Sequence, residues 1–338
     1  MKLLSVAVPC YQSAGFMRST IDALLKGGDR VEILIVDDGS KDDTPQIADE
    51  YEHSYPGICR ALHQENRGHG GAVMTGLRNA TGRYFKVCDS DDHLAEAPYL
   101  QVLDALERLE RERTPVDLFL ANYVYDKEGQ RHKKVIRYAN ALPTGRVFSW
   151  EEVGRFRLGQ YILMHAAIYR TDFLLSTGLD LPLHTFYVDS LYVYLPLRSV
   201  EKMYYLDTDL YLYYIGREGQ SVQEDVMIRR YDQQIKVNRL MLEGVQLEKV
   251  APKRKRDYMM NYLEIITTVS GVLAVRSGAE EHLRMHEQLW ADMEKERPYE
   301  SRVLRHRLLG RLLNLKSRGA RRFVIAVYHL AQKIFGFN

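Results

Sequence analysis

Three carboxylates follow a short apolar segment of this chain at close spacing. Residues 83–87 (RYFKV) are typical of a strand, and Asp89, Asp91 and Asp92 come directly after it. Carboxylates this dense repel one another, so at the end of a parallel strand they usually need a cation. Asp89 and Asp91, two residues apart, can share one ion, and Mg²⁺ and Mn²⁺ accept such oxygen ligands together with substrate phosphates. The sequence therefore predicts a metal site for a diphosphate-bearing donor, with a solvated acidic turn as the alternative.

Two other apolar segments also end in residues that could bind a ligand. Asp37 and Asp38 follow the segment 31–36, and the first apolar segment of the chain ends in Pro9 and Tyr11. Open parallel sheets bind ligands at the carboxyl ends of their strands, so these residues are expected near the acidic turn. The two carboxylates could accept hydrogen bonds from a base or a ribose, and Tyr11 could lie against a planar base. The alternatives are a turn with a helix cap for the two Asp residues and a core-edge position for Tyr11.

A glycine-rich segment, 66–73 (NRGHGGAV), stands between these motifs. It does not fit the dinucleotide-binding pattern G-x-G-x-x-G, because the third glycine would fall at Val73. Glycines before a helix can still offer backbone N–H groups to a phosphate, or let two chain segments pack closely. His69 has no matching His or Cys ligand nearby, so it is expected to be a polar loop residue rather than a metal ligand.

The alternation of apolar and amphipathic segments predicts the scaffold that carries these residues. Over roughly the first third of the chain the pattern is typical of βαβ units and a parallel sheet. Strands are expected at 3–9, 31–36, 58–63, 84–88 and 116–123, and helices at 16–26, from 43 onward, at 70–80 and at 96–113. A hairpin over 123–137 and a tyrosine-rich strand over 203–215 would make the sheet mixed. Beyond 225 the chain is expected to be helical, which places a boundary near residue 220.

The ordered motifs together resemble the nucleotide-binding half of family-2 glycosyltransferases, which have the GT-A fold. The resemblance covers roughly residues 1–125 and rests on VAVPCYQSAGFMRSTIDALL, ILIVDDGSKDDT and ENRGHGGAVMTGLRNATGRYFKVCDSDD. It implies an α/β fold with a mostly parallel nucleotide-binding sheet flanked by helices. The expected division is a GT-A domain over 1–220 and a helical C-terminal region over 221–338.

The resemblance also implies roles for individual residues. Those expected around the uracil and ribose of a UDP-sugar are Pro9, Tyr11, Asp37 and Asp38. Asp89 and Asp91 would form the DxD pair, with Asp91 as the direct metal ligand and Asp89 nearer the ribose. The catalytic base would be Asp189, about a hundred residues after the acidic turn, where Val188 replaces the Glu of the family's ED-like motif.

Two residues beyond the part of the chain that carries the resemblance, Asp189 and Arg217, could contribute to the transfer of the sugar. A carboxylate at Asp189 would remove the proton of the acceptor hydroxyl during an inverting attack, and the alternative is that it caps the next helix. Arg217 lies between two glycines in the segment IGREG. Such a loop could close over the donor and place the guanidinium on the diphosphate, with a surface turn as the alternative.

The last 38 residues are strongly basic. Residues 301–338 contain nine Lys or Arg and no Asp or Glu, and four leucines (Leu304, Leu308, Leu312 and Leu315) share one helical stripe. Such a segment suits the headgroup region of an anionic membrane, and the alternatives are packing on its own catalytic domain or on a second subunit. No run of eighteen apolar residues occurs, so no bilayer span is expected. No nucleic-acid-binding module accompanies the charge, so a nucleic-acid partner is not expected.

The expected function follows from the resemblance. It is an inverting transfer of one sugar, dependent on Mg²⁺ or Mn²⁺, from a nucleotide-sugar donor to a hydroxyl of a glycan or lipid-linked glycan in bacterial surface-glycan assembly. Three cysteines without a pairing pattern favour a reducing, cytoplasmic location, with contact to the inner face of the membrane through the basic tail. The alternatives are a polyprenyl-phosphate glycosyltransferase, a nucleotidyltransferase and a catalytically silent binding subunit.

Overall fold

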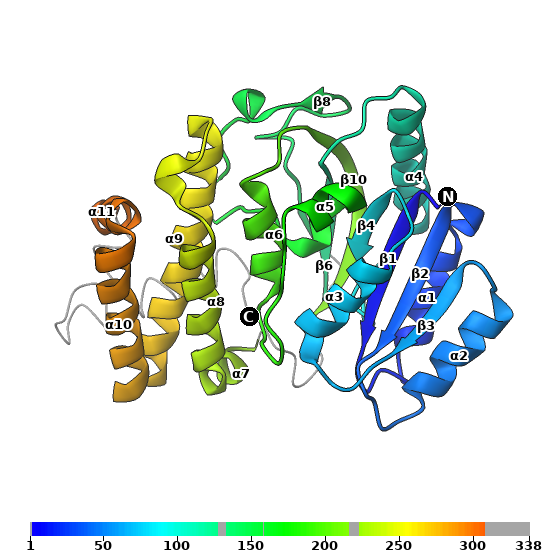
Figure 1. Ribbon diagram of the computed structural model, residues 1–338, viewed down its shortest axis with the longest axis horizontal. Helices are drawn as coiled ribbons and strands as arrows, with labels where there is room; N and C mark the ends of the chain where they lie inside the picture. Colours follow the sequence, from blue (N-terminus) through cyan, green and yellow to red (C-terminus); the bar gives the residue numbers. More distant parts are fainter. Residues whose placement is uncertain (1, 128–132, 158, 216–222, 308–338) are drawn as a thin grey trace. The chain divides into compact units, whose positions relative to one another are not determined.

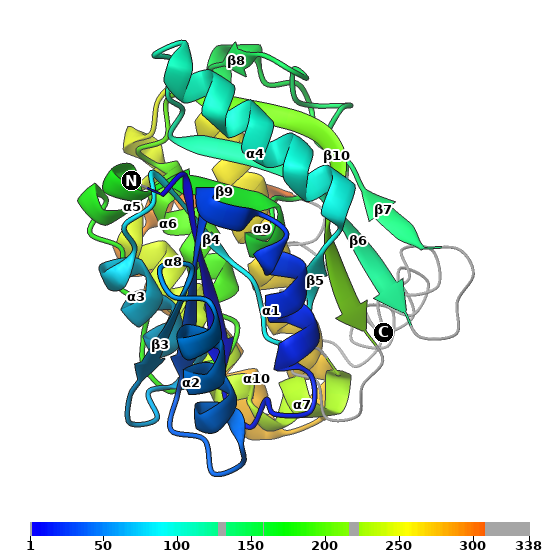
Figure 2. The same cartoon turned by 90° about the vertical axis from the view of Figure 1, so that its right-hand side faces the viewer.

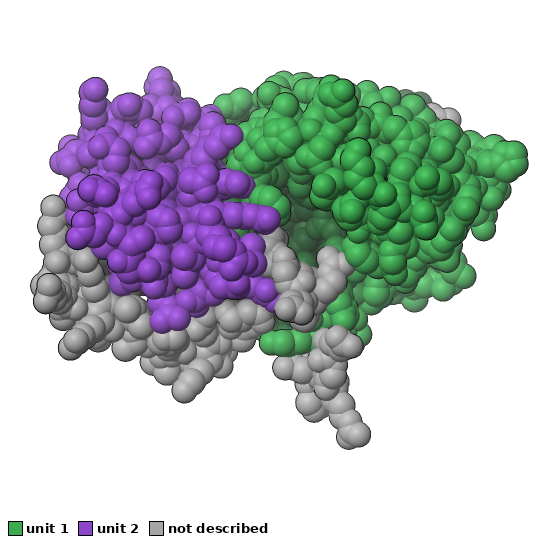
Figure 3. Space-filling view, turned by 90° about the horizontal axis from the view of Figure 1, so that it is seen from below, with its two compact units in different colours: residues 1–217 green, residues 218–338 purple. Residues whose placement is uncertain are grey.

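The computed structural model describes residues 2–127, 133–157, 159–215 and 223–307. The chain divides into two compact units, residues 1–217 and residues 218–338, which are coloured separately in Figure 3. The first unit contains the sheet and all of the candidate site residues that the structure describes. The second unit is helical.

A mixed sheet forms the centre of the first unit (Figure 1). Its strand order is β3-β2-β1-β4-β9-β6-β10-β5, with β7 paired to β6 and β8 paired to β10. Strands β1 to β4 are parallel, β9 runs antiparallel to both β4 and β6, and β10 runs parallel to β6. The strands are β1 Leu4–Cys10, β2 Val31–Asp37, β3 Cys59–His63, β4 Tyr84–Val87, β5 His93–Leu94, β6 Leu118–Lys127, β7 Lys134–Ile136, β8 Val147–Phe148, β9 Ala167–Arg170 and β10 Met203–Ile215.

Helices cover both faces of this sheet (Figure 2). Helices α1 and α4 lie together on one face, where the Tyr99 hydroxyl donates a hydrogen bond to the carbonyl of Leu24 at 3.3 Å. Helices α3 and α5 contact each other on the opposite face. The helices of this unit are α1 Met17–Leu25, α2 Thr44–Ser54, α3 Gly68–Asn79, α4 Glu96–Arg111, α5 Thr171–Ser176 and α6 Asp189–Leu197. Because helices cover both faces of the sheet, every residue of β1, β2 and β4 is buried.

The elements expected for the first part of the chain are confirmed, with ends that differ by a few residues. The tyrosine-rich strand is confirmed as β10, and β6 pairs with β7 as the expected hairpin arms do. At the start of α2, the Asp42 carboxylate accepts a hydrogen bond from the backbone N–H of Thr44 at 3.1 Å, and Asp43, the residue before the helix, makes no side-chain cap hydrogen bond. Strand β9 was not expected. It enters the sheet between β4 and β6, beside the strand that leads to the acidic turn.

A buried carboxylate ties the first strands together. Glu32 of β2 is 4% exposed and accepts hydrogen bonds from the Ser5 hydroxyl at 2.7 Å, from the backbone N–H and hydroxyl of Thr81 at 2.9 and 3.0 Å, and from Arg60 at 3.0 Å. Burial alone would raise the pKa of Glu32, but these hydrogen bonds outweigh burial and lower it. The network therefore fixes β1, β2 and β3 to the turn that precedes β4.

The second unit consists of five described helices. They are α7 Glu224–Arg229, α8 Tyr231–Gly244, α9 Lys253–Ser277, α10 Glu280–Glu296 and α11 Pro298–His306, which confirms the helical region expected beyond 225. One described helix, α9, would be long and apolar enough to cross a membrane by length and composition alone. Of its most apolar window, 67% is buried in the structure, and its neighbours in the bundle are α7, α8 and α10. Such burial is typical of a core helix.

The start of the basic tail packs on this helical unit. Leu304 is 2% exposed, the guanidinium of Arg305 lies 5.3 Å from the centre of the Trp290 ring, and Arg307 forms an ion pair with Glu264 at 2.6 Å. The first turn and a half of the tail therefore contacts the chain's own helices. Residues 308–338, which carry the rest of the proposed membrane contact, lie outside the described residues.

Candidate active site

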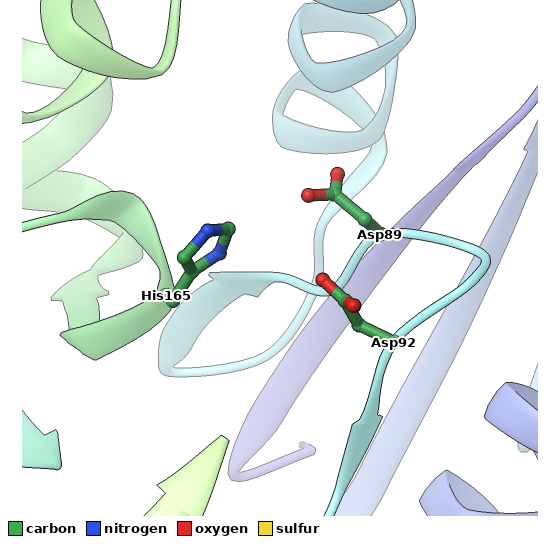
Figure 4. Close-up of side chains that lie close together, drawn as sticks. All are labelled: Asp89, Asp92 and His165. Carbon is green, nitrogen blue, oxygen red and sulfur yellow. The ribbon is translucent and has the colours of Figure 1, made fainter. Parts of the chain in front are cut away.

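The acidic turn after β4 faces a histidine from a distant part of the chain. Among the described residues, the acidic and histidine side chains whose ligand atoms all lie within 4.8 Å of one another are Asp89, Asp92 and His165. Figure 4 shows the two carboxylates on one side and the His165 ring turned towards them. Two carboxylates and an imidazole are a suitable donor set for a divalent cation. The arrangement therefore fits the metal site that the acidic turn predicted.

Asp91 of the predicted pair lies in the same turn but is not one of these three residues. It is half-buried, and its charge raises the pKa values of Asp92 and His69. The residue that the spacing argument left out, Asp92, is instead 1% exposed and directed towards His165. The turn thus carries two partly exposed carboxylates, Asp89 and Asp91, and one buried carboxylate, Asp92.

Strand β10 holds the acidic turn in place. The Tyr211 hydroxyl donates to the Asp92 carboxylate at 2.7 Å and accepts from the backbone N–H of Asp89 at 3.1 Å. The backbone N–H of Tyr214 donates to the other oxygen of Asp92 at 2.8 Å. Burial, and then the charges of Asp89 and Asp91, raise the pKa of Asp92 well above its usual range despite these hydrogen bonds. Asp92 is therefore fixed by β10 before any ligand arrives.

His165 is fixed by aromatic side chains of the same strand. It lies in a short 3-10 helix, Met164–Ala166, which leads into β9. Its ring centre lies 4.6 Å from that of Tyr211 and 4.4 Å from that of Tyr213, and its carbonyl accepts a hydrogen bond from the buried ammonium group of Lys86 at 2.7 Å. Burial lowers the pKa of His165 to about 4, so the imidazole is neutral at pH 7. Its Nδ1 atom is buried and has no hydrogen-bond partner within the described part of the chain.

A second histidine joins the acidic turn to the predicted base. Nε2 of His69 lies 2.9 Å from the Asp89 carboxylate. Burial opposes protonation of His69, but the hydrogen bond and charge of Asp89, and then the charge of Asp189, raise its pKa. Burial in turn raises the pKa of Asp189, and the charge of His69 partly offsets this. His69 is therefore not the loop residue expected from the sequence, because it lies in the first turn of α3 and interacts with both carboxylates.

Glycines allow α3 to approach the segment that carries Asp189. At Gly68, whose φ is +74°, an added Cβ would lie 2.9 Å from the backbone N and Cα of His184. At Gly70, an added Cβ would lie 2.9 Å from the carbonyl oxygen of Pro182. The backbone N–H of His184 also donates to the carbonyl of Arg67 at 2.9 Å. Of the two roles that the glycine-rich segment suggested, the structure shows close packing of two chain segments.

The residues predicted to bind the nucleotide lie at the carboxyl edge of the sheet. Pro9 is buried in β1, and Tyr11 just beyond it is 55% exposed. The Asp37 carboxylate accepts from the backbone N–H of Ser40 at 3.0 Å and lies 3.2 Å from Nδ1 of His63. Tyr11 therefore offers an open aromatic face, whereas the Asp37 carboxylate is largely buried.

The Asp38 carboxylate is hydrogen-bonded to the loop that leads into α3. Its carboxylate accepts hydrogen bonds from the side chain of Gln64 at 2.6 Å and from the backbone N–H groups of Arg67 and Gly68 at 2.7 and 2.8 Å. Asp38 therefore holds the glycine-rich turn in the structure, and its predicted contact with the nucleotide stays a prediction. Arg217, the predicted diphosphate ligand, lies outside the described residues.

A family model described as glycosyl transferase family 2 matches residues 5–173, which is half of the chain. The chain belongs to glycosyl transferase family 2. The match covers the strands that end at the acidic turn, together with His69 and His165. The family-2 resemblance and the enzyme class expected from the sequence are thereby confirmed.

Curated relatives match this family-2 chain over short segments. An uncharacterized glycosyltransferase of Rickettsia prowazekii is 42% identical over 91 residues, which are 27% of either chain. The minor teichoic acid biosynthesis protein GgaA of Bacillus subtilis is 28% identical over 151 residues, covering 41% of this chain and 33% of that protein. The matched part thus spans about a quarter to a third of the length of these relatives.

Solved structures share the fold over most of the chain. TarS from S. aureus, solved with UDP-GlcNAc, has a TM-score of 0.53 at 17% identity and covers 87% of this chain and 92% of its own. The mannosyltransferase PcManGT from Pyrobaculum calidifontis, solved with GDP-Man and Mn²⁺, has a TM-score of 0.54 at 18% identity and covers 98% of this chain and 86% of its own. At these identities the likeness shows the fold, which confirms the expected GT-A architecture.

Proposed function

We propose that this family-2 protein transfers a single sugar from a UDP-sugar to an acceptor hydroxyl, with inversion and with the help of a divalent metal ion. The acceptor would be a glycan or lipid-linked glycan of a bacterial surface polymer. This proposal is supported by GgaA, whose name places it in minor teichoic acid biosynthesis, and by TarS, which was solved with UDP-GlcNAc. The reaction would take place in the cytoplasm, at the inner face of the membrane.

One observation carries this proposal: a carboxylate from the second half of the domain lies near the acidic turn. Asp189 begins α6, and it is close enough to Asp89 and His69 for their charges to act on its pKa. A base that removes a hydroxyl proton works best when its pKa lies nearer to neutrality than that of an exposed Asp. Burial raises the pKa of Asp189 in that direction. Asp189 is therefore suited to accept the proton of the attacking hydroxyl.

The donor side would be built from the carboxyl edge of the sheet. Asp89 and Asp91 are the proposed metal ligands, and a bound Mg²⁺ or Mn²⁺ would neutralise charge on the leaving diphosphate. Tyr11 would lie against the base, beside Pro9, and Asp37 would meet the ribose. Each of these residues would bind or orient the donor, and Asp189 would accept the proton.

Measuring UDP release from a panel of UDP-sugars with Mn²⁺, with water as the surrogate acceptor, tests the proposal. Asp189→Asn should lower the rate by at least about 100-fold and leave UDP binding unchanged, because the amide keeps the shape but cannot accept the proton. Asp91→Ala should abolish metal-dependent UDP binding as well. Asp180→Asn is the matched control, since this Asp is exposed, forms an ion pair with Arg78 at 3.2 Å and should keep the wild-type rate.

The rival functions give different results in this assay, or when a polyprenyl phosphate replaces water as the acceptor. An acceptor that is already an ionised polyprenyl phosphate needs no base, so Asp189→Asn would keep its rate with that acceptor. A nucleotidyltransferase would release pyrophosphate instead of UDP. A silent binding subunit would turn over none of the sugar nucleotides. Any of these three results would reject the proposed transfer to a hydroxyl.

A further inference from the structure

We propose that His165 and Asp92 are metal ligands beside Asp89 and Asp91, and that the imidazole makes this site select a first-row transition metal ion such as Mn²⁺ over Mg²⁺. This inference rests on the proposed function in one respect, namely that a divalent ion binds at the acidic turn. It goes further in naming the imidazole as a ligand and in stating which ions the site prefers. The metal ligands expected from the sequence, Asp89 and Asp91, are both carboxylates, so they offer oxygen ligands and no nitrogen ligand.

The His165 imidazole lies close to two carboxylates of the acidic turn. His165 is 7% exposed, and its buried Nδ1 has no hydrogen-bond partner among the described residues. Buried polar atoms in folded proteins almost always have a partner, which can be a water or an ion, so this imidazole can accept one. The ligand atoms of Asp89, Asp92 and His165 all lie within 4.8 Å of one another. One ion placed among them would bind the imidazole and offset the charge of both carboxylates.

Other histidines show what distinguishes His165. Nδ1 of His282 also lacks a hydrogen-bond partner among the described residues, so a missing partner by itself is not special to His165. His63 also lies between two carboxylates, but Nδ1 faces Asp37 at 3.2 Å and Nε2 faces Asp49 at 2.9 Å, so both nitrogens are engaged. His286 of the second unit is buried to the same extent as His165, and its Nε2 accepts a hydrogen bond from the indole N–H of Trp290 at 3.2 Å. Among the described residues, His165 is therefore the histidine that both lies close to two carboxylates and has a buried ring nitrogen without a hydrogen-bond partner.

The surroundings of His165 hold the ring ready for a ligand. The stacked ring of Tyr211 and the tilted ring of Tyr213 restrict its rotation, and the hydrogen bond from Lys86 to its carbonyl fixes its backbone. Tyr211 also donates to Asp92, so one side chain orients two of the three ligands. Partners of this kind, which orient metal ligands without touching the ion, change metal affinity by about 10–100-fold when they are removed.

The nitrogen ligand determines which ion is preferred. Mg²⁺ requires oxygen ligands in near-octahedral geometry, whereas imidazole is a common ligand for transition metal ions. A site in which an imidazole joins the carboxylates should therefore retain Mn²⁺ against an excess of Mg²⁺. A site formed by Asp89 and Asp91 alone would bind both ions through oxygen and would discriminate less between them.

Electron paramagnetic resonance of Mn²⁺ bound to the full-length protein, with and without UDP, tests the inference independently of turnover. We expect pulsed spectra of the wild type to show coupling to a directly bound nitrogen, and the spectra to change when histidine is labelled with the heavier nitrogen isotope. His165→Ala should remove this coupling, weaken Mn²⁺ binding by about tenfold or more, and abolish the preference over Mg²⁺. His286→Ala is the matched control, because it removes an equally buried imidazole in the other unit, and its spectrum should equal that of the wild type.

The possible results separate this inference from the proposed function. Mn²⁺ that binds in a UDP-dependent manner without nitrogen coupling would overturn the role of His165 and leave the proposed transferase intact. Nitrogen coupling that persists in folded His165→Ala would overturn it as well, and would direct attention to His69. Absence of Mn²⁺ binding with UDP would reject the metal dependence in the proposed function itself. If His165→Ala does not fold, the isotope-labelled wild type still decides whether a histidine is bound.

Discussion

Replacement of Gly68 by Ala tests whether the glycine-rich turn positions the segment that leads to Asp189. Gly68 has a φ of +74°, and a Cβ would lie 2.9 Å from the backbone of His184. A left-handed conformation costs an L-residue about 1–2 kcal/mol. Overpacking against a neighbour costs about 1–3 kcal/mol more, because a backbone atom cannot rotate away as a side chain can. The expected loss in the free energy of unfolding is therefore about 2–5 kcal/mol.

Gly57→Ala separates these two contributions. Gly57 has a φ of +80°, and an added Cβ there would meet no atom within 4 Å, so it carries only the conformational cost. A domain of this size loses about 2–4 °C in Tm for each kcal/mol. The control should therefore lower the Tm by about 2–8 °C, and Gly68→Ala should lower it by about 2–12 °C beyond the control.

The chain contains one tryptophan in each unit, which allows the first unit to be followed alone. In a Trp290→Phe background, the fluorescence of Trp150, buried with its indole N–H bonded to the carbonyl of Val200 at 2.9 Å, reports on the first unit. Below both melting temperatures, Gly68→Ala should also lower kcat for UDP release, because Asp189 moves with the displaced segment, while KM for the donor changes less. Equal losses of Tm in the two glycine variants, together with an unchanged kcat, would refute the packing argument.

Three further predictions address the parts that hold the site. Tyr211→Phe should weaken Mn²⁺ binding, since loss of the hydrogen bond to the buried Asp92 carboxylate costs about 1–3 kcal/mol; unchanged affinity in calorimetry would mean that Tyr211 does not hold this ligand. The folded-state pKa of Glu32 is lowered, so its stabilising effect is present above its unfolded pKa and is lost as the pH falls through the folded value. Urea unfolding should therefore show a gap between the wild type and Glu32→Gln that is wide at pH 7 and narrower at pH 4, and a constant gap would contradict this. Arg307→Ala should lower the stability of the second unit by about 1 kcal/mol or less, as expected for a partly exposed ion pair, and a larger loss in the Trp290 fluorescence transition would argue for a greater role.

Local signals in the sequence were sufficient for the scaffold of the first unit. Apolar runs marked the strands that are covered on both faces, such as β2, which only Glu32 interrupts before its final Asp37. These signals depend on neighbours within a few residues, so they can be recognised without knowledge of the fold. The same holds for the acidic turn, because a strand ending in carboxylates indicates a ligand site at the sheet edge.

The full set of residues around the acidic turn could not be predicted in this way. His165 and Asp92 converge only because β9 enters the sheet between β4 and β6, and four residues with little periodicity gave no signal for that strand. His69 was excluded as a ligand because no His or Cys stood near it in sequence, yet its partner Asp89 lies twenty residues further along the chain. A sequence search for ligand spacing therefore misses pairs that are brought together by separate strands.

The tyrosine-rich strand shows how one composition signal can have two causes. Its five tyrosines over 203–215 favoured a strand because aromatic residues suit a pleated, half-buried surface, and β10 confirms that strand. Valine or isoleucine would serve that purpose equally well. The hydroxyl of Tyr211 instead links Asp92 to the backbone of Asp89, and the ring of Tyr213 packs against His165. The hydroxyl of Tyr211 and the ring of Tyr213 therefore have a role beyond forming the strand, because they hold the acidic turn and His165 in place.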